Sequence, residues 1–229
     1  MLGTIVNSLA IIAGSIAGFF LKGGMPASMS DTITKGLGLC IIYIGMSGTM
    51  KTQDLLLVII SMVIGGIIGE LIDIDKKFFQ LGDLLEKKLN KNGESKIAEG
   101  FVAASLLFCV GSMAIVGSLQ SGLEGNHDTL YTKAVLDGIT SVIFTSTMGI
   151  GVILSAVSVF LYQGLITVLA ASVKVYLTEP IVAEMTAVGS LLIMGIGINM
   201  IGAAKIKVAN LLPAVFVPFA YGIIKLIWM

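Results

Sequence analysis

The residue types most able to do chemistry lie together between Asp137 and Gly151, inside an otherwise apolar region. This stretch combines one carboxylate with several hydroxyl groups, and glycines interrupt its far end. A short, interrupted helix places hydroxyl groups and backbone carbonyls at membrane depth, where they can coordinate a cation or a small polar solute. The side chains that we assign to a candidate transport pathway here are Asp137, Thr140, Ser141, Thr145 and Ser146.

These side chains also have a structural interpretation. Asp137 follows Lys133 by four residues near the predicted outer boundary of its span, so a solvated ion pair would explain it. Hydroxyl groups in helices can bond the carbonyl oxygen four residues earlier, which would explain the serines and threonines. Because polar side chains in apolar helices are costly, Asp137 is nevertheless the first acid to test for function.

Glycines and prolines mark further candidate helix breaks. Two Gly-Ser pairs could interrupt the apolar stretch before residue 120, although close helix packing also explains glycines there, and their serines Ser112 and Ser118 join the candidate pathway. Two prolines should kink the last apolar stretch. The predicted hinges or breaks are Gly111, Gly117, Gly149, Gly151, Pro213 and Pro218.

Three amides complete the candidate pathway. Asn7, Gln163 and Asn199 all lie inside apolar stretches, and the first two fall at roughly matching places in an internal repeat. A matched pair near the ends of inverted helices could line a shared central pathway. Hydrogen bonding between helices is the structural alternative.

No residue pattern predicts a metal, a cofactor or an enzyme. His127 lies between Glu124 and Asp128, but a single histidine in a polar loop is more often solvated than bound to a metal. No apolar stretch offers a Ser/His or paired-Asp arrangement for hydrolysis.

Composition places the chain in a membrane. Of its 229 residues, 56% are hydrophobic and 12% are charged, against roughly 25% charged in an ordinary soluble domain. Thirteen of the 28 charged residues lie between Glu70 and Glu99, which leaves the other parts compatible with lipid. The net charge is zero and the chain has no arginine, so a nucleic-acid partner is not expected.

The apolar stretches predict an all-α transmembrane helix bundle in one domain, residues 1–229. A bilayer core of about 30 Å requires roughly 20 apolar residues in a helix. Residues 138–173 are uncharged and too long for one span, so we divide them at Gly149–Gly151; without this division the count is seven. The eight predicted spans are 3–21, 33–50, 55–72, 98–119, 134–148, 150–171, 182–202 and 206–228.

Lysines predict the orientation. In this scheme ten lysines fall on the side of the 73–97 loop and four on the other, which places that loop in the cytoplasm and both termini outside. Within the loop, Phe78, Leu81, Leu85 and Leu89 have helical spacing beside lysines and acids. An amphipathic helix on the membrane surface and a solvated linker helix both fit this pattern.

An internal repeat relates residues 1–72 to residues 150–229, with two linking spans in 98–148. In both, a proline precedes an acid-bearing first turn, with Asp31 in one and Glu184 in the other, where a carboxylate complements the helix dipole. With eight spans the two triplets have opposite orientations, and inverted repeats are common in secondary transporters. The pairs Gly14/Gly18 and Gly65/Gly69 favour close helix contact, and glycine-lined faces make a homodimer plausible.

Six stretches spread over the chain resemble a known family. They are residues 3–7, 108–117, 136–138, 149–151, 162–164 and 208–213. Together they resemble the YqgA/YdfK-like family of bacterial multipass inner-membrane proteins. The resemblance implies a plasma-membrane protein with transport or channel activity, and it implies no particular substrate.

These observations lead to two functional hypotheses. The first is a transporter or channel for a small ion or small polar solute, with its pathway between the inverted triplets. The second is a membrane scaffold or sensor that acts through the 73–97 helix.

Overall fold

The computed structural model describes residues 1–22, 27–77, 80 and 97–228, and within these ranges the chain is all-helical, as predicted. The elements are α1 (Leu2–Lys22), α2 (Ala27–Thr49), α3 (Leu55–Ile72), α5 (Ile97–Cys109), α6 (Ser112–Leu123), α7 (Asp128–Met148), the 3-10 helix η1 (Ile150–Leu154), α8 (Ser155–Val168), α9 (Ala170–Val173), α10 (Glu179–Met200), the 3-10 helix η2 (Val208–Phe216) and α11 (Val217–Trp228). Of the predicted amphipathic loop, the apolar positions 78, 81, 85 and 89 lie outside the described residues.

Two of the predicted breaks occur where they were expected. Gly111 separates α5 from α6 with a φ of 137°, and Gly149 separates α7 from η1 with a φ of 93°. A side chain is strained at such positive φ values, so these two positions require glycine. The axes of the segments on either side of Gly111 differ by 59°.

The other predicted breaks take different forms. Gly117 lies inside α6, where a Cβ would be 2.9 Å from Leu130 Cδ2. Gly151 lies inside η1 against the carbonyl of Ile97. Both glycines therefore permit close packing instead of breaking a helix. Pro213 lies within η2 and Pro218 in the first turn of α11, so the expected kink is a change from 3-10 to α-helix between them.

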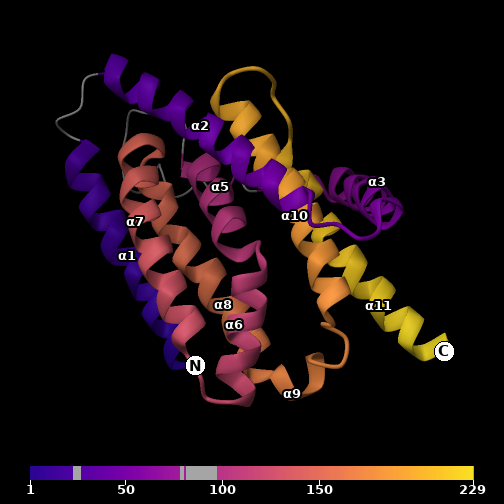
Figure 1. Cartoon of the computed structure of the whole chain (residues 1–229). Helices are drawn as coiled ribbons and strands as arrows, with labels where there is room; N and C mark the ends of the chain where they lie inside the picture. The colour runs from indigo at the N-terminus through magenta and orange to yellow at the C-terminus, as the bar shows by residue number, and fades with distance from the viewer. Residues whose placement is uncertain (23–26, 78–79, 81–96, 229) are drawn as a thin grey trace.

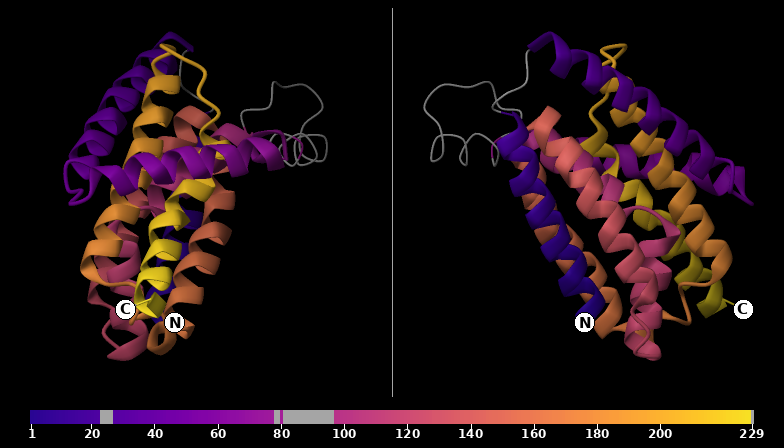
Figure 2. Two further views of the ribbon diagram at one scale, coloured as in Figure 1. Left: turned by 90° about the vertical axis from the view of Figure 1, so that its right-hand side faces the viewer. Right: turned by 60° about the vertical axis from the view of Figure 1, so that its left-hand side comes forward.

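The structure contains several helices of membrane-spanning length. Among the described residues, five are long and apolar enough to cross a membrane, or six if α5 and α6 count as one bent span. α2 and α7, which are more polar, are not among them. α3 is among them, but it runs across the bundle, whereas α1, α7 and α8 lie along it (Figure 1; Figure 2, left). Because α3 contacts η2 mainly through its glycine face, packing leaves most of its apolar side chains exposed.

Three pairs of helices organise the bundle. α1 lies beside α7 and runs parallel to it, since Gly3 meets Leu130 and Gly18 meets Thr145 (Figure 2, right). α2 packs antiparallel to α10, and α3 packs antiparallel to η2. The predicted glycine pairs therefore contact helices of the same chain: Gly14/Gly18 against α7 and Gly65/Gly69 against η2.

Glu184 fixes the turn between α2 and α3. It is 2% exposed and accepts hydrogen bonds from the backbone N–H groups of Gln53 (2.7 Å) and Asp54 (3.0 Å). The Thr52 hydroxyl donates to it as well. The carboxylate therefore binds another segment, and not the first turn of its own helix as the sequence suggested. Asp31, its counterpart, forms an exposed ion pair with Lys35.

Close contact between α1 and α7 gives a first prediction. A Cβ at Gly14 would overlap the Gly138 carbonyl oxygen, so Gly14→Ala should lower the unfolding free energy by about 1–3 kcal/mol. Gly36→Ala is the matched control, because a Cβ there meets nothing within 4 Å, and it should be neutral or slightly stabilising. Denaturant titration in detergent measures both, and equal effects would contradict the predicted contact.

Candidate functional site

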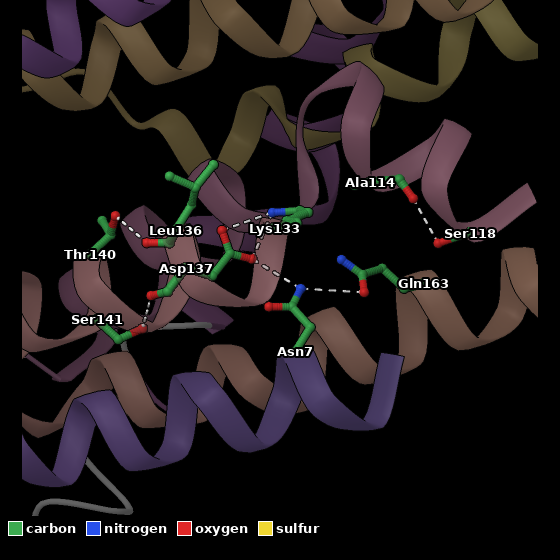
Figure 3. Close-up of polar contacts among 9 residues, drawn as sticks. All are labelled: Asn7, Ala114, Ser118, Lys133, Leu136, Asp137, Thr140, Ser141 and Gln163. Atoms are coloured by element: carbon green, nitrogen blue, oxygen red, sulfur yellow. Dashed lines mark hydrogen bonds and ion pairs between the residues drawn. The ribbon is translucent and has the colours of Figure 1, made fainter. Parts of the chain in front are cut away.

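Four side chains from three helices meet between α1, α7 and α8 (Figure 3). The Lys133 ammonium donates to Asp137 Oδ1 at 2.8 Å and to Oδ2 at 2.6 Å. The Asn7 amide donates to Asp137 Oδ2 at 3.0 Å and to Gln163 Oε1 at 3.4 Å. We call these four residues the polar cluster. The structure thus brings three predicted residues together and adds Lys133 to them.

The Lys133–Asp137 pair is buried, which corrects the expectation of a solvated pair. Both side chains are 8% exposed, and both amides of the cluster are fully buried. α7 begins at Asp128, before the predicted start at 134, so Lys133 lies inside the helix and not at its edge. Its ammonium lies 6.0 Å from the ring centroid of Phe108 on α5. Buried charges are rare in membrane helices unless they are paired, and they commonly mark functional sites.

Hydroxyl groups extend the polar cluster along the same three helices. Ser141 and Thr145 continue the four-residue spacing of Lys133 and Asp137 on α7, and Ser141 donates to the Asp137 carbonyl at 2.7 Å. Within the described part of the chain, seven buried side-chain atoms have no hydrogen-bond partner, and all lie on α1, α7 or α8. They are Thr4 Oγ1, Asn7 Oδ1, Ser8 Oγ, Ser15 Oγ, Thr145 Oγ1, Gln163 Nε2 and Thr167 Oγ1. We call the residues that carry these seven atoms, together with the polar cluster, the polar interface.

Several predicted pathway residues lie outside the polar interface. Thr140 and Ser146 donate to carbonyl oxygens of their own helix, Leu136 at 2.8 Å and Ile143 at 2.7 Å, and Thr140 points away from the cluster in Figure 3. Ser118 is buried and donates to Ala114 at 2.6 Å. Bonds of this kind to the preceding turn are what the structural interpretation of the hydroxyl groups predicts. The side chain of Ser112 lies outside the described part of the structure.

Asn199 also lies apart from the polar cluster, at the end of the molecule where α7 and α10 end. Its amide bonds the backbone of Ile206 in both directions, each at 2.8 Å, and so holds the turn before η2. It lines two neighbouring cavities, of about 480 and 280 Å³, that share Glu99 as well. Thr147 lines the smaller one, half a helical turn beyond Thr145, so these cavities lie near the end of α7 to which its polar stripe runs.

A second polar group connects α3 to η2 at the same end. Glu70 accepts hydrogen bonds from Lys207 at 2.7 Å and from Asn210 at 2.6 Å, while Asn210 Oδ1 accepts from the backbone of Asp75 at 2.7 Å. The bond to Glu70 raises the pKa of Lys207, and partial burial raises the pKa of Asp75, which lines the larger cavity.

The residues that the sequence analysis missed lie on regular stripes. On α7, residues 133, 137, 141 and 145 recur every four positions, and on α1 residues 4, 8 and 15 share one face. That spacing was visible in the sequence, but the burial of Lys133 depends on where α7 begins. His127 forms a hydrogen bond of 2.9 Å with Ser121, and among the described residues no three His, Cys, Asp or Glu side chains form a group that could hold a metal.

The polar cluster holds one positive and one negative charge with two amides in a low-dielectric setting. The fold and this site define a helical membrane protein with a buried, electrically neutral polar interface. The chain belongs to the family described as "Protein of unknown function (DUF554)", whose model matches residues 2–222.

Two relatives extend the comparison. The chain is 36% identical over 224 residues to "Uncharacterized membrane protein YdfK" of Bacillus subtilis (strain 168), covering 95% of this chain and 94% of that protein. It is 26% identical over 218 residues to "Uncharacterized protein YqgA" of Escherichia coli (strain K12), covering 93% of each. No solved structure matches the chain.

The burial of the ion pair predicts its effect on stability. Asp137→Asn leaves a buried ammonium without its counter-charge and should cost about 3–5 kcal/mol of unfolding free energy. The apolar double variant Lys133→Met/Asp137→Leu should recover most of that loss, because neither charge is then buried alone. Asp31→Asn, which breaks an exposed pair of the same spacing, should cost about 0–1 kcal/mol. Unfolding in detergent measures all three, and a double variant less stable than Asp137→Asn would contradict the prediction.

Proposed function

We propose that this protein transports a small ion or small polar solute through the polar interface between α1, α7 and α8. One contrast carries the proposal. Several buried hydroxyls elsewhere have partners: Ser61 bonds the Leu57 carbonyl at 2.6 Å, Thr186 bonds the Val182 carbonyl at 2.7 Å, and Ser121 bonds the His127 ring. Hydroxyls and amides of the polar interface are equally buried but keep free hydrogen-bonding atoms. Each such atom costs about 1–3 kcal/mol, which a passing solute would offset by bonding to it.

The proposed pathway has a definite inner end. From Asp137, α7 extends about 15 Å to Thr147, at 1.5 Å per residue, and Thr147 lines the smaller of the two cavities near Asn199. The lysine distribution assigns this end to the cytoplasm, since it lies beside the start of the 73–97 segment. Both chain termini lie at the opposite end, on different sides of the bundle (Figure 1), which fits an even number of crossings with both termini outside a bacterial cell membrane.

We also propose that residues 1–72 and 150–229 are inverted repeats. In support, each helix of the first triplet packs against its counterpart in the second: α1 against α8, α2 against α10 and α3 against η2. All three pairs are antiparallel. Gly38 and Gly45 lie beside Gly197 and Ser190, and Gly65 and Gly69 lie beside Ala214 and Asn210. α1 begins at the end of the bundle where α8 ends (Figure 1). Antiparallel pairing of equivalent helices is what a two-fold axis in the membrane plane produces. One chain supplies the whole interface, so the pathway needs no second copy.

Reconstitution of the purified chain in liposomes tests the proposal. Flux of at least one member of a panel of ions and polar solutes should exceed that of empty liposomes. Asp137→Asn should reduce this flux at least tenfold, and Asp31→Asn should change it less than twofold, because only Asp137 belongs to the polar interface. The double variant Lys133→Met/Asp137→Leu separates flux from folding, since it should be stable but inactive.

Two results would count against transport. Equal, small effects of Asp137→Asn and Asp31→Asn would give Asp137 a structural role. No flux of any solute would favour the scaffold or sensor hypothesis, which pull-down with the 73–97 segment intact and deleted would then examine.

A further inference from the structure

Charge balance in the polar cluster narrows the class of solute, if the proposed transport is correct. Lys133 and Asp137 are mutual counter-ions: both carboxylate oxygens accept from the ammonium, and both side chains are buried. A single cation bound at Asp137 would leave Lys133 unbalanced, and a single anion bound at Lys133 would leave Asp137 unbalanced. A solute that carries both charges leaves neither group without a counter-charge.

The two amides of the cluster also leave one hydrogen-bond donor and one acceptor without a partner. Gln163 Nε2 is a donor without a partner, and Asn7 Oδ1 is an acceptor without a partner, and both residues are fully buried. Figure 3 shows the Gln163 nitrogen on the side of Lys133, while the Asn7 oxygen points away from Gln163. The cluster therefore offers a cation and a donor to one end of a solute, and an anion and an acceptor to the other end.

We propose that the transported solute is a small zwitterion with a carboxylate and a protonated primary amine, of the size of a short amino acid. Its carboxylate binds Lys133 and Gln163 Nε2, and its ammonium binds Asp137 and Asn7 Oδ1. The Lys133–Asp137 bond opens and two new ion pairs replace it, so the cluster is neutral with and without solute. The flexible lysine stem permits this exchange without a change of protonation.

The surroundings set the size and the head group of the solute. Small side chains lie one helical turn from the cluster, with Thr4 three residues before Asn7 and Ser141 four residues after Asp137, so we restrict the proposed solute to a short one. An ammonium must donate hydrogen bonds to carboxylate and amide oxygens, which a trimethylated amine cannot do. Glycine and L-alanine should therefore be accepted, and the trimethyl derivative of glycine should be rejected.

Counterflow in liposomes containing the full chain tests this assignment. Labelled glycine or L-alanine should accumulate at least fivefold over empty liposomes, without a change of internal pH. Acetate and methylammonium, each carrying one of the two charged groups, should not accumulate above their level in empty liposomes. Flux of acetate or methylammonium above that of empty liposomes, and none of glycine or L-alanine, would overturn the zwitterion proposal while leaving transport intact. No flux of any probe would overturn both.

Two double variants in which the polar cluster has no net charge distinguish an effect on solute recognition from an effect on folding. The exchanged pair Lys133→Asp/Asp137→Lys keeps both charges and should retain measurable glycine counterflow, whereas Lys133→Met/Asp137→Leu should show at least a tenfold loss. Glycine should also raise the unfolding temperature of the unmodified chain in detergent, and acetate with methylammonium should not. If the exchanged pair fails to fold, the shift in unfolding temperature tests the zwitterion proposal by itself. Equal shifts with glycine and with acetate plus methylammonium would overturn the proposal.

Discussion

The two charges of an ion pair buried in an apolar bundle cannot separate unless another charge takes the place of each partner. Much of this structure keeps such a pair together. Lys133 and Asp137 are held together locally by their spacing of four residues on one helix. The remaining hydrogen-bonding capacity of Asp137 is met from α1, by Asn7. That contact needs α1 close to α7, and the glycines at positions 14 and 18 allow the two backbones to approach.

Hydrogen bonds of buried polar side chains also hold segments together at the periphery of the bundle. Apolar packing between helices is weakly directional in lipid, so specific polar contacts decide which segments meet. Glu184 of α10 holds the turn before α3, Asn199 holds the turn before η2, and Asn210 connects η2 to Glu70. Each of these contacts joins residues of one triplet to the other or closes a turn within a triplet. The antiparallel pairs of helices are thus held at their ends by hydrogen bonds and along their lengths by glycine contacts.

Much of the fold could be predicted from composition and spacing, because apolar length and glycine positions act locally. The helices, the breaks at Gly111 and Gly149 and the meeting of Asn7 with Gln163 belong to this class. What could not be predicted depends on tertiary packing: the direction of α3, the packing role of Gly117, and the burial of Lys133, which requires other helices to cover it, among them α5 with Phe108. The partner of Asn210 on η2 also depends on packing, since it is the carboxylate of Glu70 on α3.

The contact between α1 and its neighbours has an unusual composition for a stable interface, and this bears on how a pathway could open. Glycines bring the backbones together, but the side chains between them are mainly small and polar, with several unpartnered atoms. Such a surface gains little from interdigitation of large apolar side chains, which is the main contribution to tight packing. All seven unpartnered atoms of the described residues lie on α1, α7 or α8, so a movement that separates these helices would expose the ion pair together with the groups that can bond a solute.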